Sequence, residues 1–276
     1  MGLYRRRQLR AALSLLLYPF AFAVLLTFAA KLLFGRPSPS SPPPLNSPSS
    51  PQAQAGAISK ALVVASTTKD DTAWLSEIPP SLNWTINHYR VDAPLTPRLS
   101  VPLNRGNEAM VYLTYIIDNY AALPDVIFFH HGHPRAWHQK LSSADEVARL
   151  RPEYVLKAGF ASARCLDGCE NVVALHGAEP APWAAFPKLS RKEHLVTLLD
   201  AFLEPARFEA ERAVPAQIAA PCCAQFAVSR ERVLRRSREW WVKLREWLMD
   251  SPLPSMNSGR LMEHLWHVFF GMEPVQ

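Results

Sequence analysis

Four histidines within nine residues form the densest group of chemically reactive side chains in this sequence: His130, His131, His133 and His138. They follow an apolar run at residues 126–129. A continuous apolar run of this length is typical of a strand that is buried on both faces. Ligands of open α/β sheets bind beyond the carboxyl ends of the strands, so these histidines mark a candidate site.

The imidazole group suits two kinds of chemistry at this position. A histidine with an ordinary pKa of about 6.5 can act as a general base, and imidazole also binds zinc, copper or iron. Alternate residues of a strand share a face, which places His131 and His133 together and His130 opposite them. We therefore expect His131 to be catalytic, and His131 with His133 to be the ligands if a divalent metal is the cofactor. The alternative metal set is His130, His133 and His138.

A loop and a helix precede this strand. Apolar residues recur at helical spacing after Asn107, and Pro124 ends the pattern. Gly106 allows a ligand to approach the backbone closely, and an arginine binds phosphate through two parallel hydrogen bonds. Because helix N-termini bind anions, we predict a phosphate site with Glu108 as a catalytic acid or base beside it. Its binding residues would be Asn104, Arg105 and Gly106.

Other candidate site residues lie far apart in the sequence. Asp70 and Asp71 follow the predicted first strand and could hold a ribose or a metal, although an aspartate pair at this place also caps helices. Glu263 lies on a predicted last helix and is a candidate general base. Arg135 and Arg230 are candidates for neutralising a phosphate.

Strands and helices alternate along residues 58–276, which we interpret as one α/β domain. Capping-box patterns predict helices that begin at Ser143 and Ser190. A longer helix, capped by Ser229, is expected to continue to about Met249. The predicted fold is a mainly parallel sheet flanked by helices. Its strands are expected at residues 61–66, 84–91, 126–129, 171–176 and 221–229.

The N-terminal region predicts a membrane anchor. Residues 1–10 form a basic tail and residues 11–34 a transmembrane signal anchor, because the charge-free run at 11–30 would span roughly 30 Å as a helix. Residues 35–57 are a Pro- and Ser-rich stem that is expected to be disordered. The positive-inside rule gives a single-pass type II protein with a lumenal domain in the Golgi or endoplasmic reticulum. A cleaved signal peptide is the alternative.

A lumenal domain permits two covalent features. The cysteines can form one or two disulfides whose pairing the sequence leaves open, with zinc binding as the weaker alternative: Cys165, Cys169, Cys222 and Cys223. Residues 83–85, Asn-Trp-Thr, form a glycosylation sequon.

Several uncommon segments resemble a fungal family known as domain of unknown function 3431, over residues 62–271. They are NRGNEAMVYLTYIIDNY at 104–120, LPD at 123–125, FFHH at 128–131, CCAQFAVSR at 222–230 and GRLMEHLWH at 259–267. A more distant resemblance is to glycosyltransferases of the nucleotide-diphosphosugar fold, which the anchor and stem also match. That resemblance implies a sugar-nucleotide donor and a glycan acceptor. The Asp-x-Asp metal motif of those enzymes is replaced here by histidines after residue 129.

Three classes of function follow from these observations. We expect a membrane-anchored, glycosyltransferase-like enzyme that transfers a sugar from a sugar nucleotide to a hydroxyl acceptor, with Glu263 or His131 as the base. The alternatives are a histidine-metal hydrolase or oxidase, and a non-catalytic lumenal binding or scaffold domain. Nucleic-acid binding is not expected, because the basic residues lie mostly at the membrane flank and on one helix.

Overall fold

The computed structural model describes residues 56–93, 99–137, 139–163, 170–176, 190–203 and 215–276. Several predicted features lie outside this part of the chain: the membrane anchor, the stem, His138, Cys165 and Cys169. No helix among the described residues is long and apolar enough to cross a membrane.

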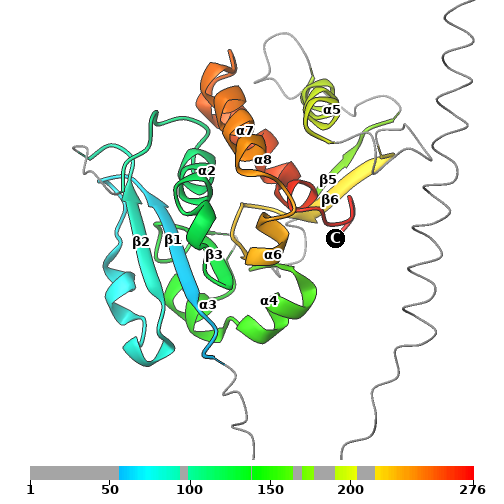
Figure 1. Cartoon of the computed structure of the whole chain (residues 1–276). Coiled ribbons are helices and arrows are strands. Elements are labelled where there is room, and N and C mark those ends of the chain that lie inside the picture. Colours follow the sequence, from blue (N-terminus) through cyan, green and yellow to red (C-terminus); the bar gives the residue numbers. More distant parts are fainter. Residues whose placement is uncertain (1–55, 94–98, 138, 164–169, 177–189, 204–214) are drawn as a thin grey trace, which may run out of the picture. The chain divides into compact units, whose positions relative to one another are not determined.

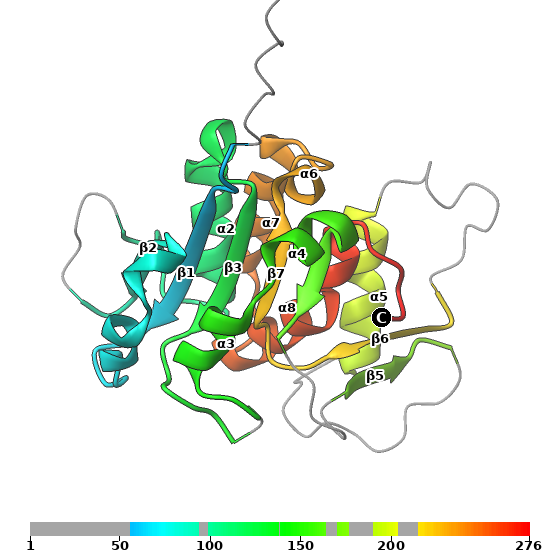
Figure 2. The ribbon, with the colours of Figure 1, turned by 90° about the horizontal axis from the view of Figure 1, so that it is seen from below.

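The central sheet has five strands in the order β2-β1-β3-β7-β4 (Figure 2). Strand β1 pairs in parallel with β2 and β3, whereas β7 runs antiparallel to both β3 and β4. The predicted mainly parallel sheet is therefore corrected to a mixed one, because β7 is inserted in the opposite direction between two strands that run alike. The strands are β1 (Lys60–Ser66), β2 (Thr85–Arg90), β3 (Val126–His131), β4 (Phe160–Ser162) and β7 (Phe226–Ser229).

A turn with a disulfide separates this sheet from a second, two-stranded one. Strands β5 (Glu170–Ala174) and β6 (Gln217–Pro221) pair antiparallel. The single strand predicted at residues 221–229 is divided between the last residue of β6 and strand β7. Between β6 and β7, Cys223 and Ala224 adopt left-handed conformations with φ of 81° and 46°. Cys222 and Cys223 form a disulfide with each other, which is one of the pairings that the sequence left open.

The helices begin largely where their caps predict. Ser190 forms the expected capping box with Glu193. Helix α3 begins at Ser143 as predicted, but its cap is Ser142. The long helix expected from Ser229 is divided into α6 and α7 because Ser237 caps a new helix. The described helices are α2 (Ala109–Asp118), α3 (Ser143–Arg149), α4 (Pro152–Ala158), α5 (Arg191–Phe202), α6 (Arg230–Val233), α7 (Arg238–Asp250) and α8 (Ser255–Phe269), with 3-10 turns η1 (Ala73–Glu77), η2 (Pro80–Leu82) and η3 (Tyr120–Ala122).

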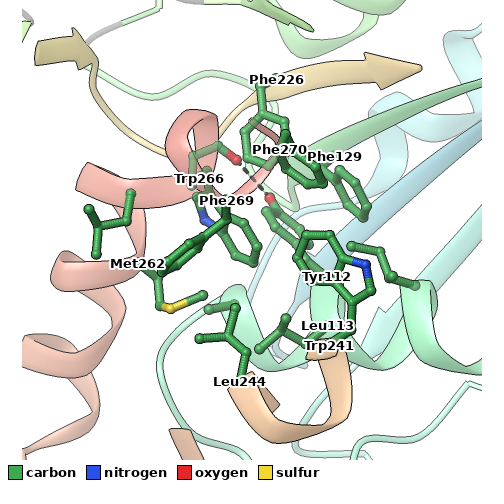
Figure 3. Packing of buried hydrophobic residues seen from close by; sticks show 14 of the residues in the cluster. Tyr112, Leu113, Phe129, Phe226, Trp241, Leu244, Met262, Trp266, Phe269 and Phe270 are labelled. Carbon is green, nitrogen blue, oxygen red and sulfur yellow. Dashed lines mark hydrogen bonds between the residues drawn. The ribbon is translucent and has the colours of Figure 1, made fainter. Parts of the chain in front are cut away.

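Helices cover both faces of the central sheet. Helices α2, α7 and α8 pack on one face, and α3 and α4 lie on the other (Figures 1 and 2). The first face holds an aromatic core in which Tyr112, Phe129 and Trp266 pack together (Figure 3). The hydroxyl of Tyr112 also donates to the carbonyl of Ala224, 3.0 Å away, which fixes the turn before β7.

Helix α8 passes very close to the loop before α2. A Cβ atom on Gly259 would lie 2.6 Å from Asn107 Nδ2 and 3.0 Å from the carbonyl carbon of Gly106. We therefore expect Gly259→Ala to lower the free energy of unfolding by about 1–3 kcal/mol. Urea denaturation measures this, with Gly56→Ala as the control because its added Cβ meets nothing within 4 Å. Equal stability of both variants would contradict the close approach.

Candidate functional site

A pocket of about 640 Å³ lies beyond the carboxyl ends of β1 and β3. The loop before α2 and the first turns of α8 form its other walls. It therefore occupies the edge of the sheet at which the sequence predicts a site. The lining residues that matter below are Ser66, Asp70, Glu108, His131, His133 and Glu263.

Two close backbone approaches bring these elements together. Gly132 lies against the end of β1, where an added Cβ would be 2.5 Å from Ser66 Cβ. Gly259 lets α8 approach the loop of Asn107, and Glu263 follows one helical turn later on the same face. This packing places Glu263 beside Glu108, although 155 positions separate them in the sequence.

Glu108 and Glu263 form a nearly buried pair of carboxyl groups, with side chains 10% and 7% exposed. Burial, reinforced by the charge of Glu263, raises the pKa of Glu108 to about 8. Burial also raises the pKa of Glu263, and this effect is opposed by Arg260 and by a hydrogen bond from the Cys223 amide. At neutral pH the pair therefore retains a proton.

The hydrogen bonds of the two carboxyl groups favour Glu108 as the site of that proton. Arg260 Nη1 donates to Glu263 Oε2 at 3.1 Å, which favours the ionised form of Glu263. No group among the described residues hydrogen-bonds to Glu108 Oε1, which is buried at the pocket wall. The arrangement thus supplies an acid and a base within one cavity.

Each pocket histidine faces a carboxyl group. His131 Nε2 lies 3.9 Å from Glu108 Oε2, and His133 Nδ1 lies 3.0 Å from Asp70 Oδ1. The two imidazole rings are 6.3 Å apart between centroids. In the described part of the chain, no three His, Cys, Asp or Glu side chains are arranged to hold a metal ion.

His130 points to the opposite face of the sheet, as the strand alternation predicts. It is completely buried, and its Nε2 lies 3.0 Å from Glu146 Oε2. The alternative metal set that combined His130 with His133 is therefore corrected, because these two side chains face different layers of the domain.

The predicted phosphate-binding residues separate into two groups. Asn104 and Asp70 line the pocket, whereas Arg105 and Gly106 do not. The guanidinium of Arg105 donates to the carbonyls of Ser251 and Leu253, which fixes the turn between α7 and α8. Gly106 has φ of 69° and donates its amide to Ser255 Oγ, so it serves the packing of α8 on this loop.

The remaining three predicted residues also make contacts outside the pocket lining. Asp71 accepts the amide of Ala73 at 3.0 Å, which is the capping role considered as the alternative. Arg135 donates to the carbonyl of Lys140. Arg230 pairs with Asp125 at 2.7 Å, at the opposite end of β3 from the pocket, because β7 is antiparallel to β3. The expectation that Arg230 borders the site is therefore corrected.

Several residues of the pocket wall are not among the residues predicted from the sequence. Arg260 lies three residues before Glu263, a spacing that predicts an ion pair on one helical face. Trp137 is 88% exposed and lines the pocket, which gives it a large aromatic surface. Cys223 reaches the pocket only because of the turn between β6 and β7, which no local pattern indicated.

The comparisons with known proteins identify a family but no activity. Residues 62–276 match the family model described as "Protein of unknown function (DUF3431)". Neither a curated protein nor a protein of solved structure matches the chain.

Proposed function

The chain belongs to the DUF3431 family, and we propose that it is a glycosyltransferase-like enzyme that moves a sugar from a sugar nucleotide to a hydroxyl acceptor. The observation that carries this proposal is the pair formed by Glu108 and Glu263 at one pocket. The parallel β2-β1-β3 part of the sheet, with the pocket at its carboxyl edge, is compatible with a nucleotide-diphosphosugar fold. The anchor and stem predicted from the sequence support a type II protein of the secretory pathway with a glycan acceptor.

The two carboxyl groups divide the proton transfers between them. Glu263, whose ionised form Arg260 stabilises, takes the proton from the acceptor hydroxyl while the acceptor oxygen bonds to the anomeric carbon. The bond from that carbon to the diphosphate breaks, and Glu108 donates its proton to the departing oxygen. Arg260 is partly exposed and lines the pocket, so a cationic group is available near the leaving diphosphate.

A resident divalent cation, which the resemblance implies, does not fit the described residues. Hard cations such as Mg²⁺ require several oxygen ligands, whereas the end of β3 and the loop after it supply imidazoles that already face carboxyl groups. The described residues also contain no cluster of three suitable ligands. The proposed reaction therefore includes no step at a metal. The negative charge of the donor diphosphate is neutralised by side chains of the pocket.

We expect Glu263→Gln to lower kcat/KM for glycosyl transfer by about 100-fold or more. The measurement is release of nucleoside diphosphate by the purified protein from a panel of sugar nucleotides, with hydroxyl acceptors present. Glu231→Gln is the matched control, because the Glu231 side chain is 77% exposed on α6. The absence of turnover, hydrolysis and thermal stabilisation with every donor would overturn the proposal.

A further inference from the structure

The side chains of a serine at the pocket and a histidine on the neighbouring strand lie within hydrogen-bond distance of each other. Ser66 is the last residue of β1 and lines the pocket, and His88 lies on the neighbouring strand β2. The Oγ atom of Ser66 is 2.7 Å from Nε2 of His88. This distance lies within the range for a nucleophile that is hydrogen-bonded to its general base.

From this juxtaposition we propose that Ser66 is a nucleophile with His88 as its general base, so that the pocket also performs acyl transfer or hydrolysis on ester substrates. This activity is distinct from glycosyl transfer and does not depend on the Glu108–Glu263 pair. The substrate class is an ester whose carbonyl carbon enters the pocket at the end of β1.

The surroundings keep the serine in place. Gly132 packs so closely that an added Cβ would lie 2.5 Å from Ser66 Cβ, and the Ser66 residue is only 5% exposed. The Ser66 hydroxyl has one other acceptor within reach, the carbonyl of Tyr89 at 3.2 Å. Donation to His88 Nε2 instead requires the tautomer of the imidazole that carries its proton on Nδ1.

The imidazole is in the form that a base requires. Burial is the largest effect that lowers the pKa of His88, and Arg90 adds to it, whereas Asp70 raises it. The net lowering leaves the ring neutral at pH 7, with Nε2 able to accept the serine proton.

The acylation step balances within this pair and an ester. The Ser66 Oγ–H bond breaks as its proton moves to His88 Nε2, and Oγ bonds to the carbonyl carbon. The bond from carbon to the alkoxy oxygen then breaks, and that oxygen leaves with the proton from His88. Water, deprotonated by His88 in the same way, releases the acid and restores the hydroxyl of Ser66.

A fluorophosphonate probe tests the proposal directly on the full chain. The serine oxygen displaces fluoride from phosphorus, and mass spectrometry of the digested protein identifies the modified residue. We expect Ser66 to carry the label in at least about half of the chains, since an activated serine reacts and an ordinary one does not. Heat-denatured protein should remain unlabelled.

The variants separate catalysis from structure. Ser66→Ala should abolish labelling, His88→Gln should slow it about 100-fold or more, and Ser76→Ala, on the exposed side of η1, should leave it unchanged. Label at a different residue, or no label on the native chain, would overturn the proposal. Mapping on the unmodified protein gives this answer even if a variant fails to fold.

Discussion

Glu108→Gln will remove the loss of stability that the parent protein shows as the pH rises towards 8, and the variant will be more stable than the parent protein at pH 8. Burial and Glu263 raise the pKa of Glu108 in the folded protein to about 8, from an ordinary value of 4.5. The folded state therefore binds this proton more tightly than the unfolded state does. The resulting stability is fully present below pH 4.5 and is lost as the pH rises towards 8.

The size of the effect follows from the shift of the pKa. Each pKa unit corresponds to about 1.4 kcal/mol, so the loss amounts to several kcal/mol for a group this deeply buried. Glutamine keeps the shape and the neutral state, and its free energy of unfolding should therefore not fall over this range. Urea denaturation at a series of pH values measures both curves.

A matched control isolates the pocket from the rest of the protein. Glu231→Gln, on the surface of α6, should give a curve parallel to that of the parent protein. The loss of stability in acid should be the same in all three proteins, because it comes from His264, which none of the substitutions changes. Burial lowers the pKa of His264 to about 3. The stability that neutral His264 contributes is therefore fully present above about pH 6.5 and is lost as the pH falls towards 3. Parallel curves for Glu108→Gln and the parent would show that the carboxyl pair holds no proton.

Local patterns were sufficient to predict the elements that carry the pocket. Apolar runs located β1 and β3, and helical spacing located α2, because burial imposes a period on each kind of element. The polar edge after β3 then followed from the general position of ligands in α/β sheets. His131 and Glu108 were each predicted to be catalytic, and the fold brings His131 Nε2 to 3.9 Å from Glu108 Oε2.

Contacts between distant segments decided what local patterns left open. The direction of β7 depends on its pairing with β3. Because this pairing is antiparallel, Arg230 lies at the end of the sheet opposite the predicted site. The guanidinium of Arg105 donates hydrogen bonds to backbone carbonyls 146 and 148 residues further along the chain. The Ser66–His88 pair likewise arises from the register of β1 and β2, since neither residue stands in a local motif.

The second large effect is expected on the other face of the sheet, where His130→Ala should lower the free energy of unfolding by about 2–4 kcal/mol. His130 Nε2 lies 3.0 Å from Glu146 Oε2, and both side chains are at least 95% buried. Gln139 Nε2 donates to the same oxygen at 3.0 Å, and the His130 ring packs against Trp74 at 5.3 Å. Removing the imidazole deprives the buried Glu146 side chain of a hydrogen-bond partner and opens a cavity in the core.

His131→Ala is the matched control, because the His131 side chain is 18% exposed at the pocket rather than enclosed in a core. We expect it to change the unfolding free energy by less than about 1 kcal/mol, since a pocket wall loses little packing. Urea denaturation at pH 7 compares the two variants under one condition. The enclosed His130 side chain should account for the larger loss of unfolding free energy. Equal losses in the two variants would contradict the assignment of His130 to a structural network and of His131 to a functional pocket.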